Sequence, residues 1–192
     1  MIRCLVMGDF HIPTRASEPP KELLDFVYSE NFDYILITGD LVRFFVIEKW
    51  FNEFWRANKV VGVYGNMDYK DVVKRFPEIK VLSFEECNYK IVLYHGTEIF
   101  PRGDPSQLAS LAEKFNAKVI ITGHTHAPVL KSFRDVVIIN PGSATGCLGG
   151  SWDALGIPSF SFVKFESTSI IGKIYVIQDF EIKCITEKEF KI

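Results

Sequence analysis

The sequence predicts an α/β fold in which two packed β-sheets are flanked by helices. Short apolar runs alternate with segments of helical periodicity as far as residue 123, which is typical of crossover units around a mainly parallel core. From residue 135 onward the chain is strand-like without a clear helix, so we expect antiparallel strands there, as a second sheet packed against the first. No repeat or linker interrupts the chain, and residues 1–192 are expected to form a single domain.

Each element follows from its local pattern. The first predicted strands are apolar runs that each end at a glycine: residues 2–8, 34–39, 59–65, 90–96 and 118–123. Helices are predicted over residues 19–31, 46–58 and 104–116, with a short helical piece after residue 65. The strand-like segments of the last part are residues 135–142, 159–166, 169–181 and 183–190.

Composition narrows the class of protein. Hydrophobic residues make up 47% and charged residues 24%, as in ordinary globular domains, and the formal net charge of -2 gives no reason to expect nucleic acid or an anionic membrane as partner. No apolar run approaches the ~18 residues of a membrane helix, and the chain enters a strand directly, without a signal peptide. The four scattered cysteines form no CxxC pair, so we expect reduced thiols in a cytoplasmic protein.

Polar residues lie beside the final glycine of each of these five strands. Since the carboxyl ends of parallel strands line the crevice where α/β proteins bind ligands, residues far apart in sequence should meet there. Singly, a Gly-Asp turn or a histidine near a strand end is commonplace, but these five ends hold every histidine of the chain. The candidate residues are Asp9, His11, Asp40, Asn66, Asp68, His95, His124 and His126.

Imidazole and carboxylate donors together suit Mn, Fe, Zn, Co or Ni rather than Ca. Seven candidate ligands oversupply one octahedral ion, so two ions that share a bridging carboxylate are expected, with His124 and His126 facing different ions. Two ions ~3.5–4 Å apart clamp the attacking and leaving oxygens of a displacement at phosphorus. We expect manganese, with Ni, Fe, Zn or Co as the alternatives.

The order of these blocks resembles the signature of the calcineurin-like metallophosphoesterases. That signature is D-x-H, GD, GN-x-D/E, a lone His and GH-x-H, and here the blocks are GDFH, TGD, GNMD, YHG and GHTH, spread over most of the chain. The family fold, an αββα sandwich, agrees with the pattern above. The resemblance implies one metal bound by Asp9, His11, Asp40 and His126, and a second bound by Asp40, Asn66, His95 and His124.

The resemblance further implies hydrolysis of a small phosphodiester by a metal-bridging hydroxide, with Asp40, Asn66 and His95 acting in catalysis. The small size and the segment INPGSATG resemble the compact phosphodiesterase branch, while GDFHIP, GHTH and IPSF are more similar still to the retromer subunit that shares this fold. A scaffold that keeps its metals without significant turnover is therefore the alternative. In the eukaryotic subunit the residues at positions 40 and 66 are replaced, whereas Asp40 and Asn66 are present here, which favours an enzyme.

Five further residues qualify this interpretation. Many family members have a proton-donating His where this chain has Met67, and methionine cannot donate a proton. Asp68 is expected either to orient a ligand or to stabilise the turn. Arg102 could reach a phosphate or be an ordinary loop residue. Trp152, in a loop-like stretch with Leu155, is a candidate for a subunit contact, so a homo-oligomer or a protein partner stays open; a nuclease is a weaker alternative, since no basic stripe is present.

Overall fold

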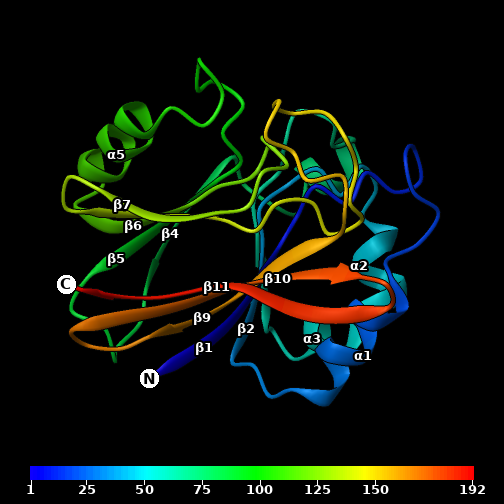
Figure 1. Cartoon of the computed structure of the whole chain (residues 1–192), viewed down its shortest axis with the longest axis horizontal. Coiled ribbons are helices and arrows are strands. Elements are labelled where there is room, and N and C mark those ends of the chain that lie inside the picture. The colour runs from blue at the N-terminus through cyan, green and yellow to red at the C-terminus, as the bar shows by residue number, and fades with distance from the viewer.

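A computed structural model describes residues 1–192 and contains eleven strands and five helices (Figure 1). The strands are β1 (Ile2–Met7), β2 (Tyr34–Ile37), β3 (Val60–Gly62), β4 (Ile79–Ser83), β5 (Lys90–Tyr94), β6 (Ala117–Ile121), β7 (Val129–Phe133), β8 (Val136–Asn140), β9 (Ser159–Phe165), β10 (Ser169–Gln178) and β11 (Glu181–Lys191). The helices are α1 (Lys21–Ser29), α2 (Phe45–Trp50), α3 (Asn52–Arg56), α4 (Lys70–Val73) and α5 (Pro105–Lys114). None of them is long and apolar enough to cross a membrane.

The strands form two mixed sheets. The first has the order β11-β10-β9-β1-β2-β3 and the second the order β4-β5-β6-β8-β7. In the first sheet β1, β2 and β3 run parallel, and in the second β5, β6 and β8 do so; every other pair is antiparallel. The two sheets and their mainly parallel cores confirm the predicted fold class.

The expected place of the C-terminal strands is correct for residues 135–142, which form β8 of the second sheet, but wrong for the three strands that follow. Strands β9 to β11 extend the first sheet, because β9 pairs antiparallel with the open edge of β1, from Ile2 opposite Phe165 to Val6 opposite Ser161. The second sheet is built instead from the middle of the chain, β4 to β8. Alternation of apolar residues shows that a strand has a buried face, but it does not identify the strand beside it.

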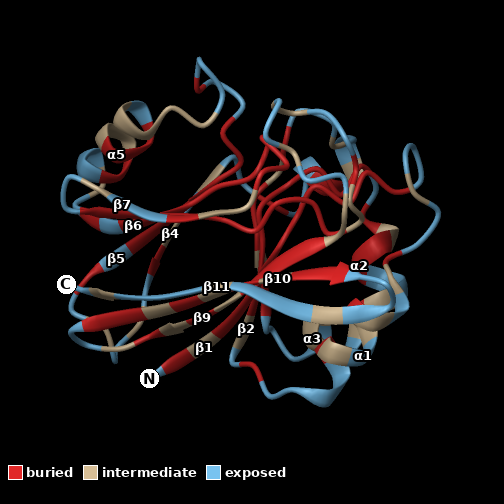
Figure 2. Ribbon diagram, in the orientation of Figure 1, coloured by how far each residue is buried: buried red, intermediate tan, exposed pale blue.

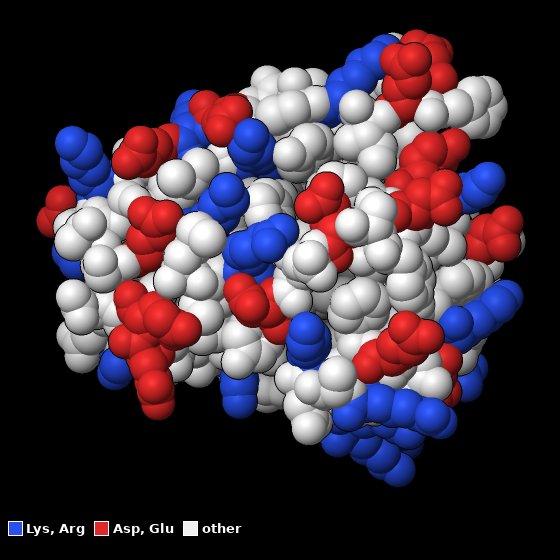
Figure 3. Space-filling view, turned by 90° about the horizontal axis from the view of Figure 1, so that it is seen from below, with Lys and Arg blue, Asp and Glu red and all other residues white.

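The fold has four layers, which are helices α1 to α3, the first sheet, the second sheet and helix α5. Three apolar clusters lie between them. One lies between the first sheet and helices α1 to α3, a second between the two sheets, and a third between the second sheet and α5. Figure 2 shows that β1, β9 and β10 are mostly buried, whereas β11 is largely exposed at the edge. On the face seen in Figure 3, acidic and basic side chains are interspersed, in keeping with the net charge of -2.

Two local features differ from the expected elements. The helix predicted over residues 46–58 is divided at Phe51, whose φ of -131° leaves the helical region. This break turns the fully buried Phe51 ring toward Phe10, with the ring centroids 5.9 Å apart. Strands β4 and β7 were not predicted, because each is an edge strand with few fully buried residues and therefore little apolar signal. All four cysteines are free, as expected.

Candidate metal centre

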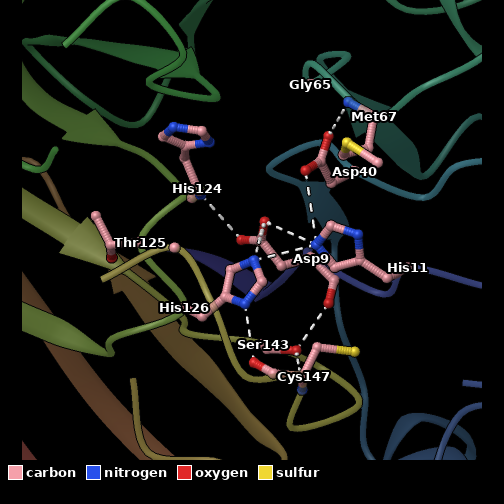
Figure 4. A network of polar contacts seen from close by, with 12 residues as sticks. Asp9, His11, Asp40, Gly65, Met67, His124, Thr125, His126, Ser143 and Cys147 are labelled. Carbon is pink, nitrogen blue, oxygen red and sulfur yellow. Dashed lines mark hydrogen bonds and ion pairs between the residues drawn. The ribbon is translucent and has the colours of Figure 1, made fainter. Parts of the chain in front are cut away.

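The polar residues at the strand ends converge in two buried groups. Asp9, His11 and His126 form one group, which Figure 4 shows beside Asp40 and His124. Asp40, His95 and His124 form the other. Within each group, ligand atoms from all three residues lie within 4.8 Å of one another. The two histidines of the GHTH turn therefore fall in different groups, because both have a left-handed backbone, with φ of 67° at His124 and 58° at His126, instead of the strand conformation that would place them on one face.

Asp40 lies between the two groups. Its Oδ2 is 3.6 Å from Nε2 of His11 and 3.4 Å from Nε2 of His95. Its other oxygen, Oδ1, accepts a hydrogen bond of 2.8 Å from the backbone N–H of Met67. The carboxylate is thus held by one oxygen and presents the other to both groups, which is the arrangement a bridging ligand needs.

Backbone groups orient the other side chains. Nδ1 of His95 lies 2.8 Å from the carbonyl of Thr38, and Nδ1 of His126 lies 2.8 Å from the carbonyl of Cys147. Since a carbonyl only accepts, each Nδ1 carries a proton, and each Nε2 faces the site as the nitrogen that can bind a metal once it carries no proton. Asp9 Oδ2 accepts from the backbone N–H of His124 at 3.0 Å, which ties the two groups together.

These residues fit a pair of divalent cations. Asp9 Oδ1 and His95 Nε2 are fully buried and make no hydrogen bond, a costly state for polar atoms unless a ligand completes them. Nε2 of His11 and Nε2 of His126 face each other at 3.1 Å, as two lone pairs aimed at one position would. A Cβ built on Gly65 would meet Asp40 Oδ1 and lie 2.7 Å from His95 Nε2, so this glycine keeps the space between them open.

The backbone at the site is strained in a consistent way. Positive φ values occur at five of the seven candidate ligands, between 49° and 67°, a conformation that costs a non-glycine residue about 1–2 kcal/mol. The five residues are Asp9, His11, Asp40, His124 and His126. Strain of this kind is typical of ligand clamps, where the surrounding structure enforces it.

Burial and charge set the two histidines of the second group apart. Burial, followed by the positive charges of His95 and Arg102, lowers the pKa of His124 to about 4. Burial also acts to lower the pKa of His95, but the carboxylates of Asp40 and Asp9 outweigh it and raise that pKa to about 9. Without metal, His124 is therefore neutral at pH 7 and His95 is protonated.

We expect metal binding to release a proton from His95 at neutral pH. A metal ligand must be deprotonated, so the apparent affinity should rise by about tenfold per pH unit between 6.5 and 9 and level off above that range. Calorimetric titration with Mn²⁺ in two buffers of different ionisation enthalpy measures the release. Affinity that does not change between pH 6.5 and 8.5 would contradict this assignment. In the metal-free protein the attraction between protonated His95 and the carboxylates of Asp40 and Asp9 stabilises the fold. This contribution is complete below pH 6.5 and is lost as the pH rises through 9.

Asp68 supports the loop that carries Asp40. Its Oδ2 accepts from the backbone N–H groups of Asp40 at 2.9 Å and Gly65 at 2.8 Å, and its Oδ1 accepts from Val42 at 2.6 Å. Val42 is a β-branched residue at a φ of 75°, a rare conformation that this hydrogen bond helps to hold. Burial, above all other effects, raises the pKa of Asp68 to about 6. Asp68 therefore stabilises the turns beside the site through backbone N–H groups, and a role in orienting a ligand stays a prediction.

Replacing Asp68 by Asn should destabilise the protein by about 1–3 kcal/mol, because an amide NH₂ would face at least one backbone N–H and leave it unpaired. Metal affinity should fall by about 10–100-fold through displacement of Asp40. Urea unfolding and metal titration measure the two effects.

Asp71→Asn is the matched control. Its carboxylate also caps a backbone N–H, that of Phe44 at 3.0 Å, yet it touches neither group. It should lower stability and leave metal affinity unchanged. Equal losses of affinity in both variants would show that Asp68 has no specific role at the site.

Asn66 and Arg102, both singled out in the sequence, line the same cavity of about 160 Å³ as Asp40, His11, His124 and His126. Asn66 is exposed at its rim, while Asp9 and His95 lie buried behind it. Sequence reasoning missed Arg15, which also lines the cavity, and the carbonyls of Thr38 and Cys147. The position of Arg15, four residues after His11, was the available signal; a backbone carbonyl leaves none.

Comparison with known proteins agrees with this geometry. The family model for the calcineurin-like phosphoesterase superfamily domain matches residues 2–159. A probable metallophosphoesterase of Methanocaldococcus jannaschii is 35% identical over 140 residues, which cover 73% of this chain and 67% of that protein.

Solved structures give the same result and confirm the likeness to the retromer subunit. Vacuolar Protein Sorting 29 from Cryptosporidium parvum superimposes with a TM-score of 0.86 at 26% identity, covering 100% of this chain and 98% of that one. Wild-type Vps29 from Entamoeba histolytica, complexed with zinc, superimposes with a TM-score of 0.80 at 28% identity, covering 99% of each chain. With its two His/Asp groups at the strand ends, this chain belongs to the calcineurin-like phosphoesterase superfamily.

Proposed function

We propose that the protein is a phosphoesterase that binds two divalent metal ions and hydrolyses phosphodiesters in preference to monoesters. The observation that carries this proposal is the pair of buried His/Asp groups joined by Asp40, which open into a single cavity. Structural sites enclose their ions completely, whereas hydrolytic sites keep a face open to substrate. Preference for diesters rests on the resemblance of the sequence to the compact phosphodiesterase branch.

The ligand sets follow the sequence and the geometry together. Asp9, His11 and His126 would hold one ion, Asn66, His95 and His124 the other, and Asp40 would bridge the two. Manganese is the expected metal. Zinc in the similar Entamoeba histolytica protein shows that a chain of this fold takes a divalent ion, and nitrogen and oxygen donors accept both metals.

Two bound ions would activate a water molecule and neutralise the charge that develops on the phosphoryl oxygens. The residues of this chain supply the positions. The Thr38 and Cys147 carbonyls fix the tautomers of His95 and His126, and the Met67 N–H leaves one Asp40 oxygen free. The left-handed backbone of the ligand residues is formed in advance, so little reorganisation is needed during reaction.

The side chain at position 67 is a methionine, which cannot protonate the leaving group. Met67 lines the cavity with 38% of its surface exposed, and a thioether donates no proton. The rate should therefore depend strongly on the acidity of the departing alcohol, which makes activated aryl esters the appropriate first substrates.

The test is hydrolysis of bis(p-nitrophenyl) phosphate beside p-nitrophenyl phosphate in a series of Mn²⁺, Zn²⁺, Ni²⁺, Co²⁺ and Fe²⁺, with His95→Ala as the inactive control. We expect faster turnover of the diester, lost in His95→Ala. Absence of turnover with every metal, while two ions bind per chain, would refute the proposal.

A retromer-subunit-like scaffold is the second candidate. It is favoured by the whole-chain similarity to vacuolar protein sorting structures and by Trp152, which is fully exposed in the loop after β8. Metal binding without hydrolysis, together with a stable protein partner recovered from its own cells, would support the scaffold instead.

A further inference from the structure

Two arginines outside the ligand set stand at the rim of the cavity. Arg15 lies in the loop after β1 and Arg102 in the loop after β5, and both line the cavity with Asp40 and His124. Each donates a hydrogen bond from Nη1 to the same segment, Arg15 to the carbonyl of Leu148 at 3.0 Å and Arg102 to that of Gly150 at 2.6 Å. In Figure 1 this yellow segment runs between the blue and green loops above the sheets.

The segment that joins the arginines is fixed to the site. A Cβ on Gly150 would lie 2.5 Å from the carbonyl oxygen of His124, so only glycine allows this approach. Ser151 Oγ donates to the carbonyl of Thr125 at 3.1 Å. The two accepting carbonyls are only two residues apart, at most about 7 Å of extended chain, so both guanidinium groups are held beside one short stretch of rim.

Neither arginine is neutralised by the protein. Four other arginines, Arg3, Arg43, Arg75 and Arg134, each lie within 4.0 Å of a carboxylate oxygen, but Arg15 and Arg102 make no such pair. Their positive charge is therefore available at the rim of the cavity, which both side chains line.

With two divalent ions bound, the net positive charge at the site would exceed the single negative charge of a simple diester. The carboxylates of Asp9 and Asp40 offset only half of the charge of two divalent ions, and the two arginines add two further positive charges. A dialkyl phosphate carries one negative charge. Each guanidinium has five N–H donors, of which the loop carbonyl occupies one, so both can still bind an anion.

We infer that Arg15 and Arg102 bind a second anionic group of the substrate, and that the preferred substrates are phosphodiesters that carry a further phosphate. This inference rests on the proposed phosphodiesterase function. The metal pair would receive the scissile phosphate, and the arginines would bind and orient the other group at the rim.

The test compares two substrates of the Mn²⁺-loaded protein, thymidine 5′-(p-nitrophenyl phosphate) with and without a 3′-phosphate. Charge-assisted hydrogen bonds should raise kcat/KM for the 3′-phosphorylated compound by about tenfold, mainly through a lower KM. In Arg15→Gln and in Arg102→Gln this ratio should fall toward one, and Arg102→Lys should restore part of it. Arg134→Gln, at the opposite end of the second sheet, should keep the wild-type ratio.

The outcomes separate the inference from the function on which it rests. If the wild type hydrolyses both compounds equally well, the second anion site is refuted and the phosphodiesterase stands. If the arginine variants lose both activities in proportion, the arginines act on the scissile phosphate, which also refutes it. If neither compound is hydrolysed, the proposed function fails. Calorimetry then decides the anion site, because it requires thymidine 3′,5′-bisphosphate to bind about tenfold more tightly than thymidine 5′-monophosphate, and equal binding overturns it.

Discussion

Asp40→Asn should reduce hydrolysis by at least about 100-fold. Loss of a residue that only supports a metal ligand costs up to about 100-fold, and Asp40 is itself an expected ligand. Asp40 Oδ2 lies within 3.6 Å of Nε2 atoms from both groups, so in the proposed site its charge would serve two ions at once. An amide oxygen is a weaker, uncharged donor. We therefore expect fewer than two ions per chain, measured by elemental analysis after dialysis, together with the loss of aryl phosphodiester turnover.

The fold should survive this change, because asparagine can still accept the Met67 N–H that Asp40 Oδ1 accepts at 2.8 Å. Asp135→Asn, in the exposed turn between β7 and β8, is the control and should keep both ions. A folded Asp40→Asn protein with two ions and undiminished turnover would rule out a bridging role for this carboxylate.

Gly65→Ala should abolish binding at the second group while the first group keeps its ion. The added methyl would meet Asp40 Oδ1 and lie 2.7 Å from His95 Nε2, so it would occupy the space where these two side chains approach each other. Neither neighbour can move freely, because Asp40 accepts the Met67 N–H and His95 contacts the Thr38 carbonyl. Metal content should fall from two ions to one, and hydrolysis should fall at least as far as in Asp40→Asn.

Gly172→Ala is the control that distinguishes loss of metal binding in Gly65→Ala from general destabilisation by an added methyl group. A Cβ on Gly172, in β10, would lie 2.8 Å from Leu130 Cδ1, the end of a flexible side chain far from either group. Gly172→Ala should therefore lower stability by about 1–3 kcal/mol, as overpacking does, and leave both ions in place. Loss of metal in both variants would mean that general destabilisation explains the result at Gly65.

The site was more predictable than the sheet order. Asp9, Asp40 and His95 were found because each follows a buried apolar run beside a glycine, and parallel topology brings such ends together. The pairing of β9 with β1 was not predicted, because it depends on which sheet edge is open, and the strand pattern does not show this. The break at Phe51 was missed because the helical periodicity continues across it.

The supporting contacts were the least predictable part. The carbonyl of Thr38 orients His95, but every residue has a carbonyl, and only the fold decides which one faces an imidazole. Asp68 was recognised as a neighbour of the site, yet its three backbone donors come from two different loops. The spacing of Arg15 from His11 places it near the site, but its hydrogen bond to the Leu148 carbonyl joins segments that are far apart in the sequence and depends on the fold.

The left-handed backbone of the candidate ligands also constrains how this protein can diverge. A descendant that bound no metal would not need the imidazoles of His124 and His126, but it would still need residues that tolerate φ values near 60°. Glycine, asparagine and aspartate do so, as Asn58 and Asn116 already do elsewhere in this chain, whereas valine or isoleucine would strain the turn. Substitutions at these positions should therefore favour small polar residues and glycine. The backbone conformation of the turn should then be retained even where metal binding is lost.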